Sequence, residues 1–166
     1  MKIELKKITY SARLSEETQA FAADVWIDGK RAGEVSNDGQ GGPNRYHPWD
    51  IEQRINTYAD TLPKVRTTFE DKDDPTGFWH MKLDADSLVN ELLHNHLMVK
   101  DFKRAIGKRV LFTREGKVYE TKTMTSDALK QLLANNARLS TLKADAILNL
   151  LPEDQAFAIY RGAASA

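Results

Sequence analysis

The segment from Asn37 to Trp49 concentrates residue types that bind ligands or partners. It holds three glycines, Gly39, Gly41 and Gly42, between a predicted strand and a predicted helix. A glycine-rich turn before a helix can present free backbone N–H groups to an anion such as phosphate. The spacing differs from the dinucleotide-binding pattern, and no Gly-Lys-Ser/Thr follows to hold a nucleotide or Mg²⁺. Two alternatives stay open: an anion site, or a loop that needs glycine for its backbone angles.

The same segment carries polar and aromatic side chains that are common at binding surfaces. Aromatic residues and arginine are enriched where proteins meet. We therefore expect a binding surface formed by Asn37, Asp38, Asn44, Arg45, Tyr46, His47 and Trp49. If the loop holds an anion instead, His47 is the candidate acid or base, because the histidine pKa suits proton transfer near neutral pH.

Other histidines and carboxylates do not match a metal site. His94 and His96 lie two apart on a predicted helix and point about 160° from each other, so one ion cannot reach both. A calcium loop that began at Asp71 would need glycine at its sixth position and glutamate at its twelfth. These positions hold Thr76 and Lys82. We expect no metal and no cofactor.

Two further patterns point toward nucleic acid. Glu115-Gly116-Lys117 has the acid-x-Lys spacing of metal-dependent nucleases, but it falls in a predicted hairpin turn where these residues are ordinary. Non-catalytic binding of nucleic acid is another hypothesis, and it requires a cluster of basic residues. The candidates are Lys100, Lys103, Arg104, Lys108 and Arg109, although cations are also favoured at the end of a helix.

Composition restricts the class of protein. The 166 residues, 41% hydrophobic and 29% charged, are typical of one globular domain, which we expect to span residues 1–166. Lys+Arg and Asp+Glu both number 24, so no overall charge favours nucleic acid. The absence of cysteine excludes disulfides and thiol chemistry. With no signal peptide and no membrane-length apolar run, we expect a cytoplasmic protein without membrane contact.

The N-terminal half alternates like a set of strands. Residues 2–10 change their apolar face midway, which predicts a bulge or a strand covered on both sides. Residues 18–28 are the clearest strand, with apolar side chains at every second position. Asp28-Gly29 then predicts a two-residue turn into a partner strand over 30–36.

Helical spacing and strand alternation organise the middle of the chain. Residues 48–62 predict an amphipathic helix that Pro63 ends. Two short strands, 65–69 and 78–83, flank a polar turn. A long central helix follows over about 84–106. Asn95 lies on its apolar stripe, as part of a packing network or of a site.

The remainder predicts a hairpin over 109–122 and helices that begin near Ser126 and Pro152. We expect an α+β fold in which a mainly antiparallel sheet, built from the two hairpins and the N-terminal strand, packs against the long central helix and C-terminal helices.

Two segments, 27–39 and 147–152, resemble segments of small accessory proteins of bacteria, phages and plasmids. The resemblance implies a protein that binds another macromolecule, host-defence machinery included. Our leading hypothesis is a non-catalytic protein-binding or regulatory module that blocks a host complex. The alternative is an enzyme that acts on nucleic acid or a nucleotide through the 37–47 loop.

Overall fold

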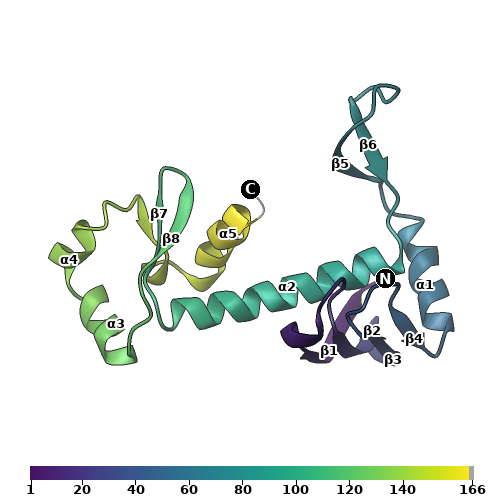
Figure 1. The fold of residues 1–166 in the computed structure, drawn as a ribbon, viewed down its shortest axis with the longest axis horizontal. Helices are drawn as coiled ribbons and strands as arrows, with labels where there is room; N and C mark the ends of the chain where they lie inside the picture. The colour runs from purple at the N-terminus through teal and green to yellow at the C-terminus, as the bar shows by residue number, and fades with distance from the viewer. Residues whose placement is uncertain (165–166) are drawn as a thin grey trace. The chain divides into compact units, whose positions relative to one another are not determined.

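The structure, a computed structural model, describes residues 1–164 and forms two compact units (Figure 1). The first comprises residues 1–94, and the second comprises the described residues from 95 to 164. Helix α2 (Ala85–Ile106) runs through the boundary and contributes to both. Each unit combines helices with antiparallel strands, which confirms the predicted α+β class. The single domain expected over the whole chain stays a prediction.

A four-stranded antiparallel sheet forms the first unit. Its strand order follows the chain: β1 (Ile3–Tyr10), β2 (Phe21–Ile27), β3 (Lys30–Asn37) and β4 (Arg45–His47). Asp28 and Gly29 join β2 to β3 with positive φ angles of 50° and 79°, as the predicted two-residue turn requires. The strand β4 lies inside the segment that was predicted to be a loop.

Strand β1 contains the predicted bulge. Its register against β2 shifts midway, where Lys7 has a φ of 50°. Because one residue is inserted there, Ile3 and Leu5 before the bulge lie on the same sheet face as Ile8 and Tyr10 after it. The bulge therefore offsets the change of apolar face in the sequence, so that β1 presents one continuous apolar face.

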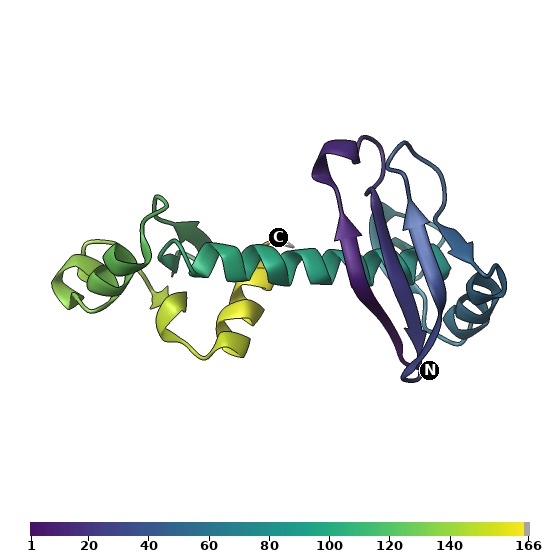
Figure 2. The same cartoon turned by 90° about the horizontal axis from the view of Figure 1, so that it is seen from below.

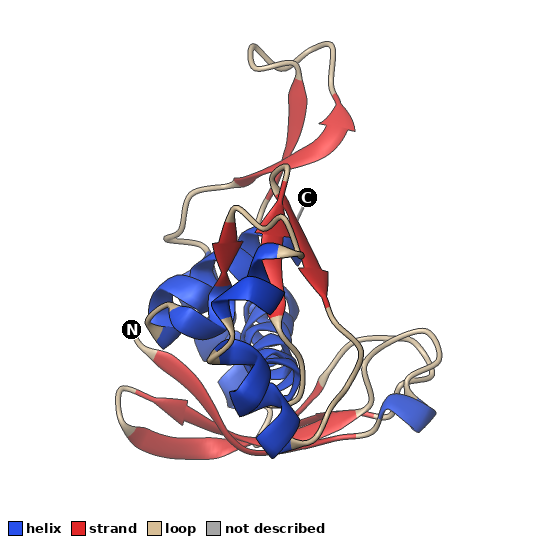
Figure 3. Ribbon diagram, turned by 90° about the vertical axis from the view of Figure 1, so that its left-hand side faces the viewer, coloured by secondary structure: helices blue, strands red, loops and turns tan. Residues whose placement is uncertain are grey.

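Helices cover one face of this sheet and leave the other open (Figures 2 and 3). The buried side chains come from β2, β3, α1 (Asp50–Ala59) and the first half of α2. Helix α1 begins two residues later and ends three residues earlier than predicted; at its end Thr61 and Leu62 donate to the carbonyls of Tyr58 and Ala59 in tighter turns before Pro63. Between β1 and β2 lies a short η1 helix (Ala12–Leu14).

Two predicted strands form a ribbon of their own. Strands β5 (Val65–Glu70) and β6 (Phe78–Met81) pair only with each other, on either side of the predicted polar turn. The sequence offers Asp84 or Asp86 as the cap of the following helix α2; the structure uses Asp84, whose carboxylate accepts a 2.7 Å hydrogen bond from the backbone N–H of Ser87. This bonding, with the Ser87 hydroxyl as its largest contributor, lowers the pKa of Asp84.

The second unit has a three-stranded sheet in the order β8-β7-β9. The predicted hairpin is β7 (Leu111–Arg114) with β8 (Lys117–Glu120), and β9 (Ala146–Ile147) adds to β7. The two hairpins therefore lie in separate sheets. The helices are α3 (Ser126–Leu133), α4 (Asn136–Ser140), η2 (Leu148–Leu150) and α5 (Glu153–Ala164).

Two small apolar clusters hold this unit together, one around Phe102 and Leu148 and the other around Val110 and Leu129. The Asn149 side chain connects the end of α2 with strand β7 through hydrogen bonds. It accepts from the N–H of Leu111 and donates to the carbonyls of Ile106 and Arg109. None of the helices within residues 1–164 has the length and apolarity needed to cross a membrane.

Candidate functional site: the outer face of the four-stranded sheet

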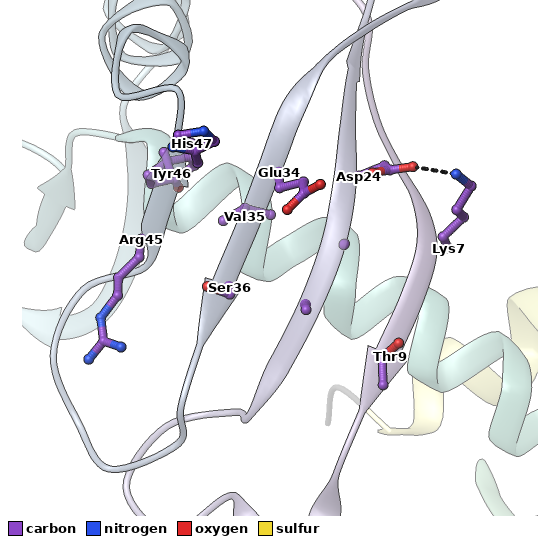
Figure 4. A pocket seen from close by; sticks show the side chains of 11 residues that line it. Lys7, Thr9, Asp24, Glu34, Val35, Ser36, Arg45, Tyr46 and His47 are labelled. Atoms are coloured by element: carbon purple, nitrogen blue, oxygen red, sulfur yellow. Dashed lines mark ion pairs between the residues drawn. The ribbon is translucent and has the colours of Figure 1, made fainter.

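The uncovered side of the four-stranded sheet carries polar side chains that line a hollow of about 250 Å³ (Figure 4). We call this side the outer face. Strand alternation places Asp24 of β2, Glu34 of β3, and Arg45 and His47 of β4 on it. The hollow is also lined by Lys7, Thr9, Ala22 and Ser36. Four neighbouring strands thus contribute to a single surface.

Asp24 is the centre of the charged groups. Its side chain is only 8% exposed and contacts Arg31 Nη2 at 2.8 Å and Lys7 Nζ at 3.1 Å. The bulge in β1 positions Lys7 for this contact. The hydrogen bond from Arg31, followed by that from Lys7, lowers the pKa of Asp24 despite its burial. The carboxylate is therefore charged at neutral pH, and the same bond raises the pKa of Arg31.

Further partners extend this cluster along the outer face. Arg31 also contacts Glu34, at 2.6 Å. The ammonium group of Lys6 lies 3.7 Å from the ring centre of Trp26, in a cation–π contact. The Trp26 indole nitrogen is buried and has no hydrogen-bond partner among the described residues.

The edge of the outer face near β4 is open to solvent. The Arg45 side chain is 73% exposed and contacts Asp38 at 2.6 Å. Trp49, just before α1, is also 73% exposed, which is unusual for so large an aromatic side chain. Exposed arginine and tryptophan side chains are the residue types that anchor protein interfaces.

The glycine-rich loop is held from within by a polar network. Asn37 accepts from the Thr18 hydroxyl at 2.7 Å and donates to Asn44 at 3.2 Å. Asn44 in turn donates to Asn90 of α2 at 3.1 Å. Asn37 and Asn44 are buried. These two amides therefore fix the loop.

Tyr46 also faces inward. Its hydroxyl donates a 2.8 Å hydrogen bond to Asp86, whose other oxygen accepts from the backbone N–H of Asn44. Burial, reinforced by the negative charge of Asp86, raises the pKa of Tyr46. Tyr46 is thus a neutral donor that ties β4 to α2.

Backbone amides that an anion would use in this loop already have partners. The N–H groups of Gly39, Gln40 and Gly41 donate to the side chains of Asn37, Asp38 and Thr18, in that order. An incoming phosphate would have to displace these acceptors and approach acidic side chains. The loop geometry therefore favours glycine's backbone role over the anion site.

The structure separates the seven predicted site residues into two groups. Arg45 and His47 line the outer hollow, Trp49 lies exposed beyond β4, and Asp38 contacts Arg45. The inward group comprises Asn37, Asn44 and Tyr46.

Sequence reasoning missed Lys7, Asp24, Arg31 and Glu34. The available signal was an aspartate in the middle of an otherwise apolar strand.

The candidate basic cluster in the second unit is largely neutralised. Lys103 contacts Glu153, Arg104 contacts Asp101, and Arg109 contacts Glu120. Cations that already have an acidic partner contribute less free energy to the binding of nucleic-acid phosphates. Within residues 1–164, no three His, Cys, Asp or Glu side chains gather as a metal site.

Comparisons with protein-family models, with curated proteins and with solved structures found no match to this chain.

Proposed function

We propose that this protein is a non-catalytic regulatory module that binds another protein through the outer face of its four-stranded sheet. One observation carries the proposal: charged side chains from four strands, the exposed Arg45 among them, line one hollow, and the exposed Trp49 follows the hollow residue His47 by two positions. A planar guanidinium and an indole are the side chains that most often dominate binding energy at protein interfaces. Mixed charges around them give specificity for a complementary surface.

The charge state of Asp24 suits recognition more than proton transfer. A general acid or base needs a pKa near the working pH. Asp24 has its pKa lowered by Arg31 and Lys7, so it is a fixed anion in an ion-pair network. Such a network presents a constant pattern of charge to a partner.

The resemblance of residues 27–39 and 147–152 to accessory proteins of phages and plasmids guides the choice of partner. We propose that the partner is a host protein complex and that binding inhibits it, with host-defence machinery as the target class. The enzyme alternative, which depends on an anion in the 37–47 loop, has less support because the loop amides are already bonded.

Affinity capture tests the proposal. Tagged wild type and the double variant Arg45→Ala/Trp49→Ala are incubated with nuclease-treated bacterial lysate, and captured proteins are quantified by mass spectrometry. Neither side chain is buried, so the variant should fold. The matched control is Arg138→Ala/Leu150→Ala, which removes an exposed cation and an exposed apolar side chain from the second unit.

We expect one protein or complex to be enriched by wild type and control, and reduced by about tenfold or more with the Arg45/Trp49 variant. Equal enrichment by all three proteins would refute the assigned surface. In a parallel capture from untreated lysate, a partner that is enriched only when nuclease is omitted would assign the contact to nucleic acid instead.

A further inference from the structure

The β5–β6 ribbon exposes large apolar side chains to solvent. Phe69 is 69% exposed and Trp79 is 48% exposed. Aromatic side chains of this size are usually buried to a greater extent. We call the four exposed residues the ribbon's apolar face: Val65, Phe69, Trp79 and Met81. A contiguous exposed apolar patch marks a contact surface.

The strand register places the four residues together. Val65 pairs directly with Met81 across the ribbon. Trp79 lies two residues from Met81, so strand alternation puts it on the same side as the Val65–Met81 pair. The register shifts between Arg66 and Glu70, where β5 has two more residues than β6, but Glu70 pairs with Phe78 on the other side, so its neighbour Phe69 lies on the side of Trp79. Trp79 is located between the Val65–Met81 pair and Phe69 along the ribbon, which makes it the centre of the apolar face.

The opposite side of the ribbon already has its own contacts. The Arg66 guanidinium lies 3.6 Å from the ring centre of Phe78. His80 Nδ1 lies 3.2 Å from a carboxylate oxygen of Asp74. Polar side chains are thus partnered within the ribbon, while the apolar side chains are not covered. Water alone would favour the opposite arrangement, with the apolar side chains covered and the polar side chains exposed.

The rest of the first unit does not cover the apolar face. Neither strand makes extensive contact with another helix or strand of the described chain. In Figures 1 and 3 the ribbon extends away from α1 and from the four-stranded sheet. A two-stranded ribbon without packing on one face is at best marginally stable in water, so a partner for this face would stabilise it.

Charge is distributed unevenly along the ribbon. Its tip, residues 70–77, holds four acidic residues and one lysine, a net charge of −3. The base has three cations and no acid among residues 64–69 and 78–82, a net charge of +3 with histidine neutral. The cations are Lys64, Arg66 and Lys82, of which Lys82 also contacts Asp60 at 2.8 Å.

We propose that a second copy of this chain covers the apolar face, with the two ribbons packed face to face and antiparallel about a twofold axis. In this arrangement each acidic tip lies against the basic base of the other copy. Trp79, at the centre, lies close to the axis and packs against the same residue of the second copy. Such a contact is self-complementary and closed, as twofold interfaces are.

A nucleic-acid partner fits the ribbon less well, because its tip would repel phosphate. An unrelated protein partner would leave the purified chain monomeric. The proposal does not depend on the outer face of the four-stranded sheet.

Sedimentation velocity over a concentration series tests the self-association. We expect purified wild type to be in monomer–dimer equilibrium. Phe69→Ser/Trp79→Ser should weaken the dimer by at least about tenfold. Trp49→Ser is the matched control, because it removes an even more exposed tryptophan from outside the ribbon, and it should leave the equilibrium unchanged.

Charge swapping tests the antiparallel geometry. It also keeps the proposal testable if the Phe69/Trp79 variant fails to fold. The tip-reversed chain carries Asp71→Lys/Asp73→Lys, in the turn at the tip, and the base-reversed chain carries Lys64→Glu/Lys82→Glu. Each alone should dimerise roughly tenfold more weakly, because like charges then meet at both ends. An equimolar mixture should recover the wild-type dimer, since tip and base are again complementary.

A wild type that is monomeric at every concentration would overturn the proposal. So would a dimer that survives the Phe69/Trp79 change or is lost with Trp49→Ser. Failure of the mixture to recover association would overturn the antiparallel arrangement. These readouts need no external partner, so they are separate from the test of the proposed function.

Discussion

At the scale of single residues, Asp24 links the fold to the candidate site. Its carboxylate is surrounded by Arg31 and Lys7, and its pKa lies below the ordinary value of 3.8. The contacts therefore stabilise the folded state at a pH above that value. The stabilisation is lost as the pH falls through the lowered pKa, because the protonated group no longer attracts the cations.

The corresponding prediction concerns acid stability. Between neutral pH and about pH 3, the free energy of unfolding should fall less steeply for Asp24→Asn than for wild type. Urea titrations followed by circular dichroism measure this slope. Glu91→Gln, a neutralised carboxylate exposed on α2, is the control and should keep the wild-type slope. Identical slopes for wild type and Asp24→Asn would show that the ion pairs do not contribute.

Residue types predicted part of the candidate site. Arg45, His47 and Trp49 were selected because arginine, histidine and aromatic residues are common in binding surfaces, and the structure leaves all three exposed. Asn37 and Asn44 have the same polar character, yet they are buried as loop supports. Residue type alone cannot separate these roles, since the difference depends on partners such as Thr18 and Asn90 that lie far away in sequence.

At the scale of secondary-structure elements, Gly33 permits a close approach. A Cβ atom at Gly33 of β3 would overlap the carbonyl oxygen of His47 and lie 2.5 Å from Ile51 Cδ1. Strand β3 can therefore pack beside the start of α1 only because it has no side chain there.

Replacing this glycine tests that packing. We expect Gly33→Ala to lower the free energy of unfolding by about 1–3 kcal/mol, as overpacking of a filled interior does. Gly162→Ala is the matched control, because Gly162 lies in α5 with no atom near its would-be Cβ. Chemical denaturation of both variants measures the difference, and equal stabilities would contradict the close approach.

Periodicity predicted most elements because it reflects burial along one strand or helix. The bulge in β1, the turn at Asp28-Gly29 and the extent of α2 are confirmed. The pairing of separate segments was harder to predict. Strand β9 has only two residues and joins β7 across more than thirty residues of chain, so no local pattern marks it. For the same reason, the sequence did not show that the two hairpins belong to different sheets.

At the scale of the whole molecule, the chain has two compact units that share α2. Asn149 is a specific support of the second unit, because its one side chain satisfies three backbone groups. Its loss would leave those groups without partners, which costs about 1–3 kcal/mol for each group that water cannot reach.

Hydrogen exchange can test this division. In Asn149→Ala, amide exchange measured by mass spectrometry should accelerate in β7 and α5 more than in β2 and β3. The physical reason is that local contacts determine the free energy of local opening. Equal acceleration in both units would show that they unfold as one.

The outer face is the central claim at this scale, and site-specific photo-crosslinking tests it most directly. The photoreactive amino acid p-benzoylphenylalanine is placed at His47, in the hollow, or at Lys130, which is exposed on α3 of the second unit. After illumination in bacterial lysate, we predict a covalent adduct from position 47 with the same protein that affinity capture enriches, and none from position 130. An adduct from position 130 alone, or no adduct from position 47, would contradict the claim that this face binds the partner.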